Sequence, residues 1–182
     1  MKLMVASDIH GSSFCCEKLI EAFKKEKPDK LLLLGDLLYH GPRNDLPQGY
    51  APKKVIEMLN SIKHDVICIK GNCESEVDQM VLQFPIMAEY AYIYIDGLTI
   101  FATHGHKYNN DNLPMINEGD ILLCGHTHIP AFNKEEKYIY INPGSVSIPK
   151  ENSKNSYIII EDNICKFKDI EGNEYSKFNI LY

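Results

Sequence analysis

The first seventy residues of the chain alternate between short apolar runs and segments with helical spacing, and this alternation constrains the fold more than any other feature. The predicted strands are residues 2–7, 31–34 and 65–70, and the predicted helices are residues 13–27 and 52–62. Pro52 suits a helix start, because the first turn of a helix leaves its N–H groups without intrahelical partners. Strands that alternate with helices predict a sheet with the helices packed on it.

The second half of the chain contains more strands than helices. The predicted strands there are residues 91–95, 98–104, 121–126, 138–144, 156–160 and 164–170. Asp96-Gly97 lies between two apolar runs and predicts a hairpin turn, and Asp162-Asn163 predicts another. We therefore expect an α/β fold in which two sheets pack together with helices outside. No repeat or linker interrupts residues 1–182, which we interpret as a single domain.

Charge and hydropathy exclude several classes of protein. The net charge of −6 argues against broad nucleic-acid binding, which requires clustered Lys and Arg. No apolar run approaches the roughly 18 residues of a membrane span, and the N-terminal MKLMVASDIHG is too short for the apolar part of a signal peptide. The six cysteines form no CxxC pair, so reduced thiols are expected rather than a disulfide framework. These features predict a cytoplasmic protein that does not bind membranes.

Metal-binding residue types follow the predicted strands at five places. In chain order they are Asp8 and His10, Asp36, Asn72, His104 with His106, and His126 with His128. Six of the seven histidines lie in or just after these clusters. Ligands of open α/β sheets gather at the carboxyl ends of strands, and imidazole, carboxylate and amide groups bind divalent cations. Each motif alone is weak, but the five together predict a metal site, and the number of donors suggests two ions.

The order D-x-H, G-D, G-N, G-H and G-H-x-H resembles that of the calcineurin-like metallophosphoesterases. GDLLYHGPRNDLPQGYAPKKV, GNCESEVDQM, GHTHIP and NPGSVSIPK resemble more narrowly the YfcE-type bacterial phosphodiesterases. The resemblance extends from the N-terminus to about residue 150, and the remaining residues match only as strands that close a sheet. It implies a four-layer α/β/β/α sandwich with a dinuclear centre, and a homodimer or higher homo-oligomer.

The resemblance also implies a ligand set for each ion. The residues at matching positions are Asp8, His10, Asp36 and His128 for one ion, and Asp36, Asn72, His104 and His126 for the other, with Asp36 bridging. It favours Mn²⁺, although the donors themselves do not separate manganese, iron and zinc.

Two ions about 3.5–4 Å apart can hold a hydroxide between them and clamp phosphoryl oxygens for in-line attack. Two dications, the carboxylates of Asp8 and Asp36 and one hydroxide leave a net charge of about +1, which attracts a phosphodiester monoanion. We therefore expect hydrolysis of a small phosphodiester. The expected catalytic residues are Asp36, Asn72, His104 and Cys73. Metal-bound imidazoles are oriented by neighbouring groups that hydrogen-bond to them. Residues 142–145 and Thr127 are candidates for this role, although turn and strand-end roles suit them as well.

Two further residues are candidates for substrate binding. Arg43 lies in the long loop 37–51, and its guanidinium suits bidentate contact with phosphate, or else with loop carbonyls or a neighbouring subunit. Loops of this length are often functional, although Pro and Gly also suit a surface excursion. His106 lies two residues beyond His104 and could contact the substrate or a ligand. No role is assigned to His40.

Cys73 departs from the pattern of the superfamily, in which a histidine commonly follows Gly-Asn and is thought to protonate the leaving oxygen. A thiol has an ordinary pKa near 8.5 and is a poor proton relay beside two cations, which favour its thiolate. We hypothesise that the enzyme prefers diesters whose leaving group needs little protonation, such as aryl esters.

Two other readings stay open. The first is a phosphomonoesterase or nuclease of the same superfamily, which the acidic charge and the absent histidine disfavour. The second is a noncatalytic interaction scaffold, which the complete set of seven predicted ligands disfavours. The sequence does not identify the physiological diester: cyclic nucleotides, modified nucleotides and phospholipid-derived diesters all fit.

Overall fold

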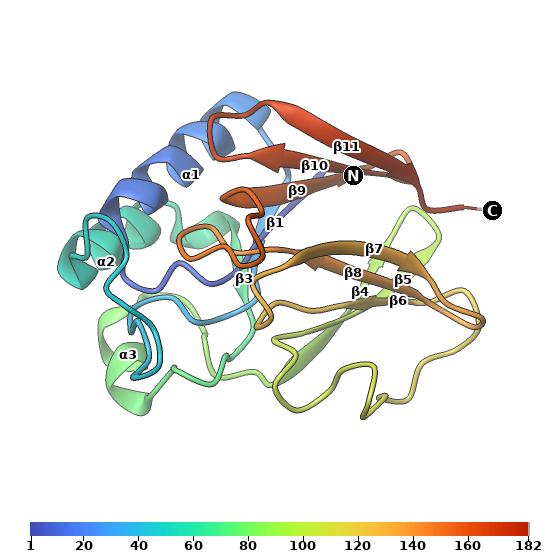
Figure 1. Cartoon of the computed structure of the whole chain (residues 1–182), viewed down its shortest axis with the longest axis horizontal. Coiled ribbons are helices and arrows are strands. Elements are labelled where there is room, and N and C mark those ends of the chain that lie inside the picture. The colour runs from blue at the N-terminus through green and yellow to red at the C-terminus, as the bar shows by residue number, and fades with distance from the viewer. Residues whose placement is uncertain (182) are drawn as a thin grey trace.

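The computed structural model describes residues 1–181, which form two packed sheets with helices at one side (Figure 1). The six-stranded sheet has the order β11-β10-β9-β1-β2-β3. Its strands are β1 (Leu3–Ala6), β2 (Lys30–Leu33), β3 (Val66–Cys68), β9 (Ser156–Glu161), β10 (Ile164–Asp169) and β11 (Glu174–Asn179). Strands β1, β2 and β3 pair in parallel, as their helical connections require.

The five-stranded sheet has the order β4-β5-β6-β8-β7. Its strands are β4 (Tyr90–Ile95), β5 (Leu98–Thr103), β6 (Ile121–Leu123), β7 (Pro130–Lys134) and β8 (Ile139–Pro143). Strands β5, β6 and β8 are parallel, and the two edge strands are antiparallel to their neighbours. Both sheets are therefore mixed, and the predicted fold class of two packed mixed sheets is confirmed.

The helices are α1 (Ser13–Glu26), α2 (Pro52–Ser61) and α3 (Glu76–Val81), with a 3₁₀ turn at Lys63–Asp65. Ser12 caps α1 by accepting the N–H of Cys15, and α1 ends where Lys27 adopts a left-handed conformation. Helices α1 and α2 bury Leu19 and Leu59 against the outer face of the six-stranded sheet. The two long helices thus lie where the sequence predicts them, within about one residue at each end.

A layer of aliphatic side chains fills the space between the sheets. Val5 and Leu32 of the six-stranded sheet face Ile100 and Ile121 of the other sheet in this layer. Alternate residues of each strand point to opposite faces, so Met4 and Leu31 contact the helices instead. This double burial explains the continuous apolar runs of β1 and β2.

The outer face of the five-stranded sheet differs from the expectation of a helical layer. The irregular segment 104–120 runs along this side of the sheet (Figure 1). Its Tyr108 and Ile116 pack against Phe101 and Leu122. The segment is rich in Asn, Asp, Gly and Pro, which favour turns over helices. The fourth layer of this protein is therefore irregular chain.

Both predicted hairpin turns are present, whereas three short elements escaped prediction. Asp96 and Asp162 have φ angles of 50° and 51°, which the tight turns between β4 and β5 and between β9 and β10 require. The unpredicted elements are α3, β7 and β11. Helix α3 has only six residues, and β7 begins with a proline, so neither has a clear periodic signal. Within the described chain, no helix has the length and apolar character needed to cross a bilayer.

Candidate metal centre

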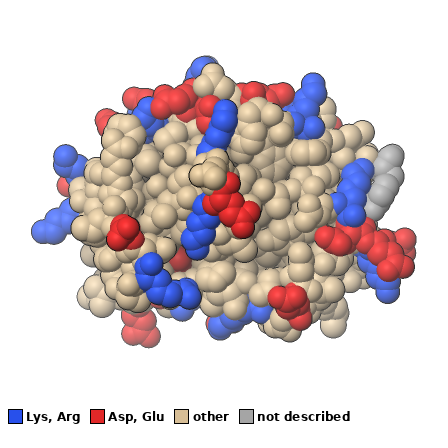
Figure 2. Space-filling model, in the orientation of Figure 1, with Lys and Arg blue, Asp and Glu red and all other residues tan. Residues whose placement is uncertain are grey.

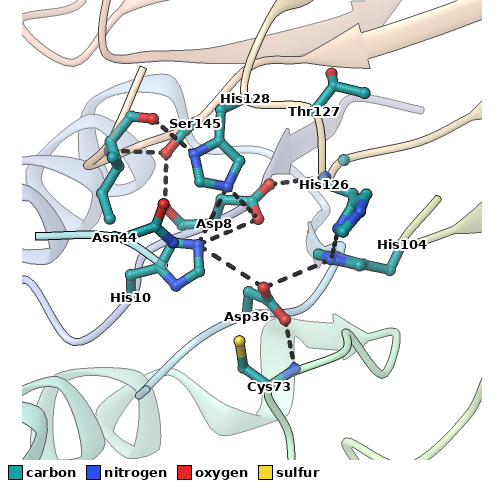
Figure 3. A network of polar contacts seen from close by, with 12 residues as sticks. Asp8, His10, Asp36, Asn44, Cys73, His104, His126, Thr127, His128 and Ser145 are labelled. Atoms are coloured by element: carbon teal, nitrogen blue, oxygen red, sulfur yellow. Dashed lines mark hydrogen bonds and ion pairs between the residues drawn. The ribbon is translucent and has the colours of Figure 1, made fainter. Parts of the chain in front are cut away.

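The segments that follow β1, β2, β3, β5 and β6 converge at one place and bring the seven predicted donors together, of which Figure 3 labels all but Asn72. In each sheet the strands that carry donors run parallel, so their carboxyl ends lie at the same edge. Packing of one sheet on the other then places the two edges beside each other. Sites of this kind form where several strand ends meet.

The first group of donors is Asp8, His10 and His128. The Oδ1 atom of Asp8 lies 3.4 Å from Nε2 of His10 and 3.2 Å from Nε2 of His128. The two Nε2 atoms are 3.2 Å apart. All three side chains are almost fully buried, so their lone pairs have little access to bulk water.

The second group is Asn72, His104 and His126. Nε2 of His104 lies 3.1 Å from Oδ1 of Asn72 and 3.2 Å from Nδ1 of His126. Oδ2 of Asp36 is 3.6 Å from Nε2 of His104 and 3.7 Å from Nε2 of His10. The Asp36 carboxylate therefore lies between the two groups, at the position that a bridging ligand would occupy.

Backbone carbonyls fix the orientation of three imidazoles. Nδ1 of His10 is 2.8 Å from the carbonyl of Tyr39, and Nδ1 of His128 is 2.7 Å from that of Ile148. Nδ1 of His104 is 2.6 Å from the carbonyl of Leu34. Each contact requires a proton on Nδ1, so the neutral ring presents the lone pair of Nε2 to the centre.

These lone pairs test whether the residues fit a cation. In the neutral tautomers, Nε2 of His10 and Nε2 of His128 face each other without a proton between them. Oδ1 of Asp8 is buried beside them and accepts no hydrogen bond. Buried acceptors that face one another are stable only with positive charge between them. The residues therefore fit bound divalent metal ions.

The pKa values of Asp8 and His126 agree with this donor set. Burial alone would raise the pKa of Asp8, but contact with His10 and His128 holds it well below its usual range. Burial and the neighbouring His104 lower the pKa of His126 to about 4. At neutral pH the carboxylate is therefore charged and the imidazole of His126 is neutral, which are the protonation states that bind metal.

Five of the seven donors have backbone φ angles in the left-handed region. Asp8, His10, Asp36, His126 and His128 have φ angles between 48° and 67°. Left-handed backbone costs a non-glycine residue roughly 1–2 kcal/mol. The fold holds the donor-bearing segments in strained conformations, as is common at functional sites.

Glu74 supports the centre and was not predicted. Its buried carboxylate accepts the backbone N–H groups of Asp36 at 2.9 Å, Leu37 at 2.7 Å and Gly71 at 2.5 Å. It thus ties the segment after β2 to the segment after β3. A Cβ added to Gly71 would clash with Oδ1 of Asp36, so the two segments approach as closely as glycine allows. The sequence offered one signal for this role, which is that an acidic residue stands two positions after Asn72.

Residues 142–147 support the other side of the centre. The hydroxyls of Ser145 and Ser147 donate to the carbonyl of Asp8 at 2.8 and 3.0 Å. The amide of Asn142 donates to the carbonyl of Gly125 at 2.8 Å and to the hydroxyl of Thr127 at 3.0 Å. These contacts hold the backbone of two donor-bearing segments in place.

A cavity of about 460 Å³ opens over the centre. Besides donor residues, Arg43, Cys73 and Lys150 line it. His106, the other predicted substrate contact, is not among the lining residues: its ring lies beside His104 with 5.3 Å between centroids. Lys150 was not predicted, because the sequence does not show which lysine of many lies beside a site.

Comparison with known proteins agrees with the fold. Residues 1–163 match the family model of the calcineurin-like phosphoesterase superfamily domain. The chain is 48% identical to phosphodiesterase YfcE of Escherichia coli K12 over 164 residues, which cover 90% of this chain and 89% of that protein. It also resembles phosphodiesterase MJ0936 of Methanocaldococcus jannaschii, with 26% identity over 79% of this chain and 83% of that protein.

Solved structures extend the comparison. The structure of YfcE from E. coli, described as a phosphoesterase, superposes with a TM-score of 0.96 at 44% identity, covering 99% of this chain and 100% of that one. The zinc complex of Vps29 from Entamoeba histolytica has a TM-score of 0.66 at 18% identity, covering 99% of both chains, and shares the fold. On the strength of the family match and the 48% identity, the chain belongs to the calcineurin-like phosphoesterase superfamily.

Proposed function

We propose that the protein is a divalent-metal-dependent phosphodiesterase. The observation that carries this proposal is the pair of donor groups that share the Asp36 carboxylate. Its membership of the superfamily and its 48% identity to a phosphodiesterase support the same activity. A small phosphodiester is the proposed substrate.

The donor groups suggest how two ions would be held. Asp8, His10 and His128 would hold one ion, and Asn72, His104 and His126 the other, with Asp36 contacting both. When bound, such ions activate water and neutralise charge on the phosphoryl oxygens during in-line displacement. We propose Mn²⁺, and zinc or iron would suit the same donors.

The protein's own groups would position the substrate. Asp36 keeps its place through the N–H of Cys73, which donates to Oδ1 at 2.9 Å. Arg43 lines the cavity and would contact phosphate oxygens with its guanidinium. Asp8 and His10 are almost fully buried, so their side chains have little access to bulk water. Basic and acidic side chains are interspersed on the face shown in Figure 2, which offers no continuous basic surface for a nucleic-acid polymer.

Metal removal tests the proposed function. Chelator treatment is expected to abolish hydrolysis of bis(4-nitrophenyl) phosphate, and added Mn²⁺ should restore it with about two ions per chain in elemental analysis. Faster hydrolysis of 4-nitrophenyl phosphate would instead indicate a phosphomonoesterase. A protein that binds no metal and hydrolyses neither compound would be a scaffold.

The leaving group should matter strongly, because Cys73 stands where a proton donor would act. Burial and the Asp36 carboxylate raise the pKa of Cys73, so its surroundings in the protein make its thiol a weak acid. General acid catalysis is typically worth about 10²- to 10⁴-fold. Across a series of methyl aryl and methyl alkyl phosphates, kcat/KM should therefore fall steeply as the leaving group becomes more basic.

Cys73→His should make this dependence shallower by improving the poor leaving groups most. Cys124→Ser, a change at another cysteine beyond the cavity lining, serves as the control and should leave the slope unchanged. A shallow slope in the wild type, or the same slope in Cys73→His, would refute the role of Cys73.

A further inference from the structure

Two cationic side chains line the cavity. Arg43 reaches it from loop 37–51, and Lys150 from the segment after β8. Within residues 1–181, neither side chain makes a hydrogen bond or ion pair. The backbone N–H of Lys150 donates to the carbonyl of His128 at 3.1 Å, which holds this residue beside the centre. Unpaired cations over a cavity are available to an anionic ligand.

Arg43 is also the one arginine in the sequence, and the 18 other basic residues are lysines (19 − 1). A lysine satisfies most needs for surface charge, whereas a planar guanidinium is specific for bidentate contact with phosphate or carboxylate. The placement of the one guanidinium in the cavity indicates that this geometry is needed there.

The positive charge of Arg43 and Lys150 exceeds what the binding of a simple phosphodiester requires. A diester carries a single negative charge, and the metal centre proposed above, with its two carboxylates, already attracts it. Asp36 is the one carboxylate among the described lining residues, so Arg43 and Lys150 are not neutralised at the rim of the cavity. A substrate with a second anionic group would match them.

The second anionic group would lie close to the metal centre. A Cβ added to Gly41, two residues before Arg43, would lie 3.6 Å from Sγ of Cys73, so the loop that carries Arg43 borders the residue that follows the candidate ligand Asn72. An anionic group bonded directly to the reacting phosphorus would lie within the same cavity as the two cations. A phosphate monoester is such a group: it leaves readily as an anion, and it carries the charge that the two cations can bind.

We propose, building on the proposed function, that the substrate is a diphosphate esterified on both phosphorus atoms, with Arg43 and Lys150 as the specificity-determining contacts to its second phosphate. Water adds to one phosphorus, and the bond from that phosphorus to the bridging oxygen breaks. The bridging oxygen leaves on the second phosphate with its electron pair. Two phosphate monoesters result, and the protons of the water pass to solvent.

Kinetics give the first test. Diphenyl diphosphate, with one phenyl ester on each phosphorus, is compared with diphenyl phosphate in the Mn²⁺-loaded enzyme. The diphosphate should be preferred at least about 100-fold in kcat/KM, and Lys150→Gln and Arg43→Gln should each reduce this preference about tenfold. Arg43→Lys should recover only part of it, because an ammonium lacks the bidentate geometry. Lys53→Gln, an exposed change on α2, is the matched control and should change neither rate.

Binding gives a second test that does not depend on turnover. Calorimetric titration of the same proteins compares the methylene-bridged analogue of diphenyl diphosphate with diphenyl phosphate. We expect the bridged analogue to bind about tenfold more tightly to the wild type, and this advantage to disappear in Lys150→Gln and Arg43→Gln. Equal affinity for both ligands, or equal losses for both in the variants, would overturn the inference. If bis(4-nitrophenyl) phosphate is still hydrolysed in that case, the proposed phosphodiesterase stands and only the diphosphate assignment fails.

Discussion

Asp36→Asn is expected to lower kcat/KM for bis(4-nitrophenyl) phosphate by at least about a thousandfold, the largest effect on activity that we predict. Oδ2 of Asp36 lies 3.7 Å from Nε2 of His10 and 3.6 Å from Nε2 of His104, one from each donor group. An amide nitrogen at this position cannot bind a metal and would donate to these imidazoles instead. The replacement of this one oxygen would thus weaken the binding of both ions of the proposed centre.

The loss should come from metal binding and not from unfolding. Asparagine has the shape of aspartate, and its Oδ1 can still accept the N–H of Cys73. In the wild type this nitrogen lies 2.9 Å from Oδ1 of Asp36. The metal-free variant is therefore expected to unfold at or above the temperature of the metal-free wild type, while elemental analysis shows fewer bound ions. Asp45→Asn, an exposed change in loop 37–51, is the matched control and should keep both ions and full activity. An Asp36→Asn enzyme that keeps its metal and its rate would refute the proposed centre.

Glu74→Ala is expected to have the largest effect on stability, with a loss of about 3–9 kcal/mol in the free energy of unfolding. The Glu74 side chain accepts three buried backbone N–H groups, from Asp36, Leu37 and Gly71. Each N–H left without an acceptor in the interior costs about 1–3 kcal/mol. Because domains are stable by only about 5–15 kcal/mol, such a loss approaches the total.

Urea unfolding of the metal-free proteins measures this effect without interference from ligand binding. Glu74→Gln keeps one oxygen acceptor and should lie between the wild type and Glu74→Ala. Glu76→Ala changes an exposed carboxylate two residues later and should shift the free energy of unfolding by less than about 1 kcal/mol. If Glu74→Ala is as stable as Glu76→Ala, the three N–H contacts are not important for the fold.

The elements that the sequence predicted correctly have strong local signals. Residues 31–34 form a continuous apolar run, and residues 13–27 have helical spacing, so backbone geometry alone decides which side chains share a face. The Asp96 and Asp162 turns follow from residues that tolerate positive φ. Helix α3 and strands β7 and β11 are short or lie at edges, and tertiary contacts rather than local preference stabilise them.

Residue types at strand ends and their order along the chain pointed to the donors of the candidate centre, because these are local properties, and the family resemblance implied how two ions would share them. The tertiary structure adds the physical reason for this arrangement: Asp36 stands between two groups because the strand ends of two separate sheets meet there. It also decided the roles of neighbours that look alike in sequence. His106 lies beside His104 and is not among the lining residues of the cavity, Lys150 lines the cavity, and Glu74 accepts three buried N–H groups. Contacts between residues far apart in the chain depend on how the sheets pack, and sequence spacing carries no record of that packing.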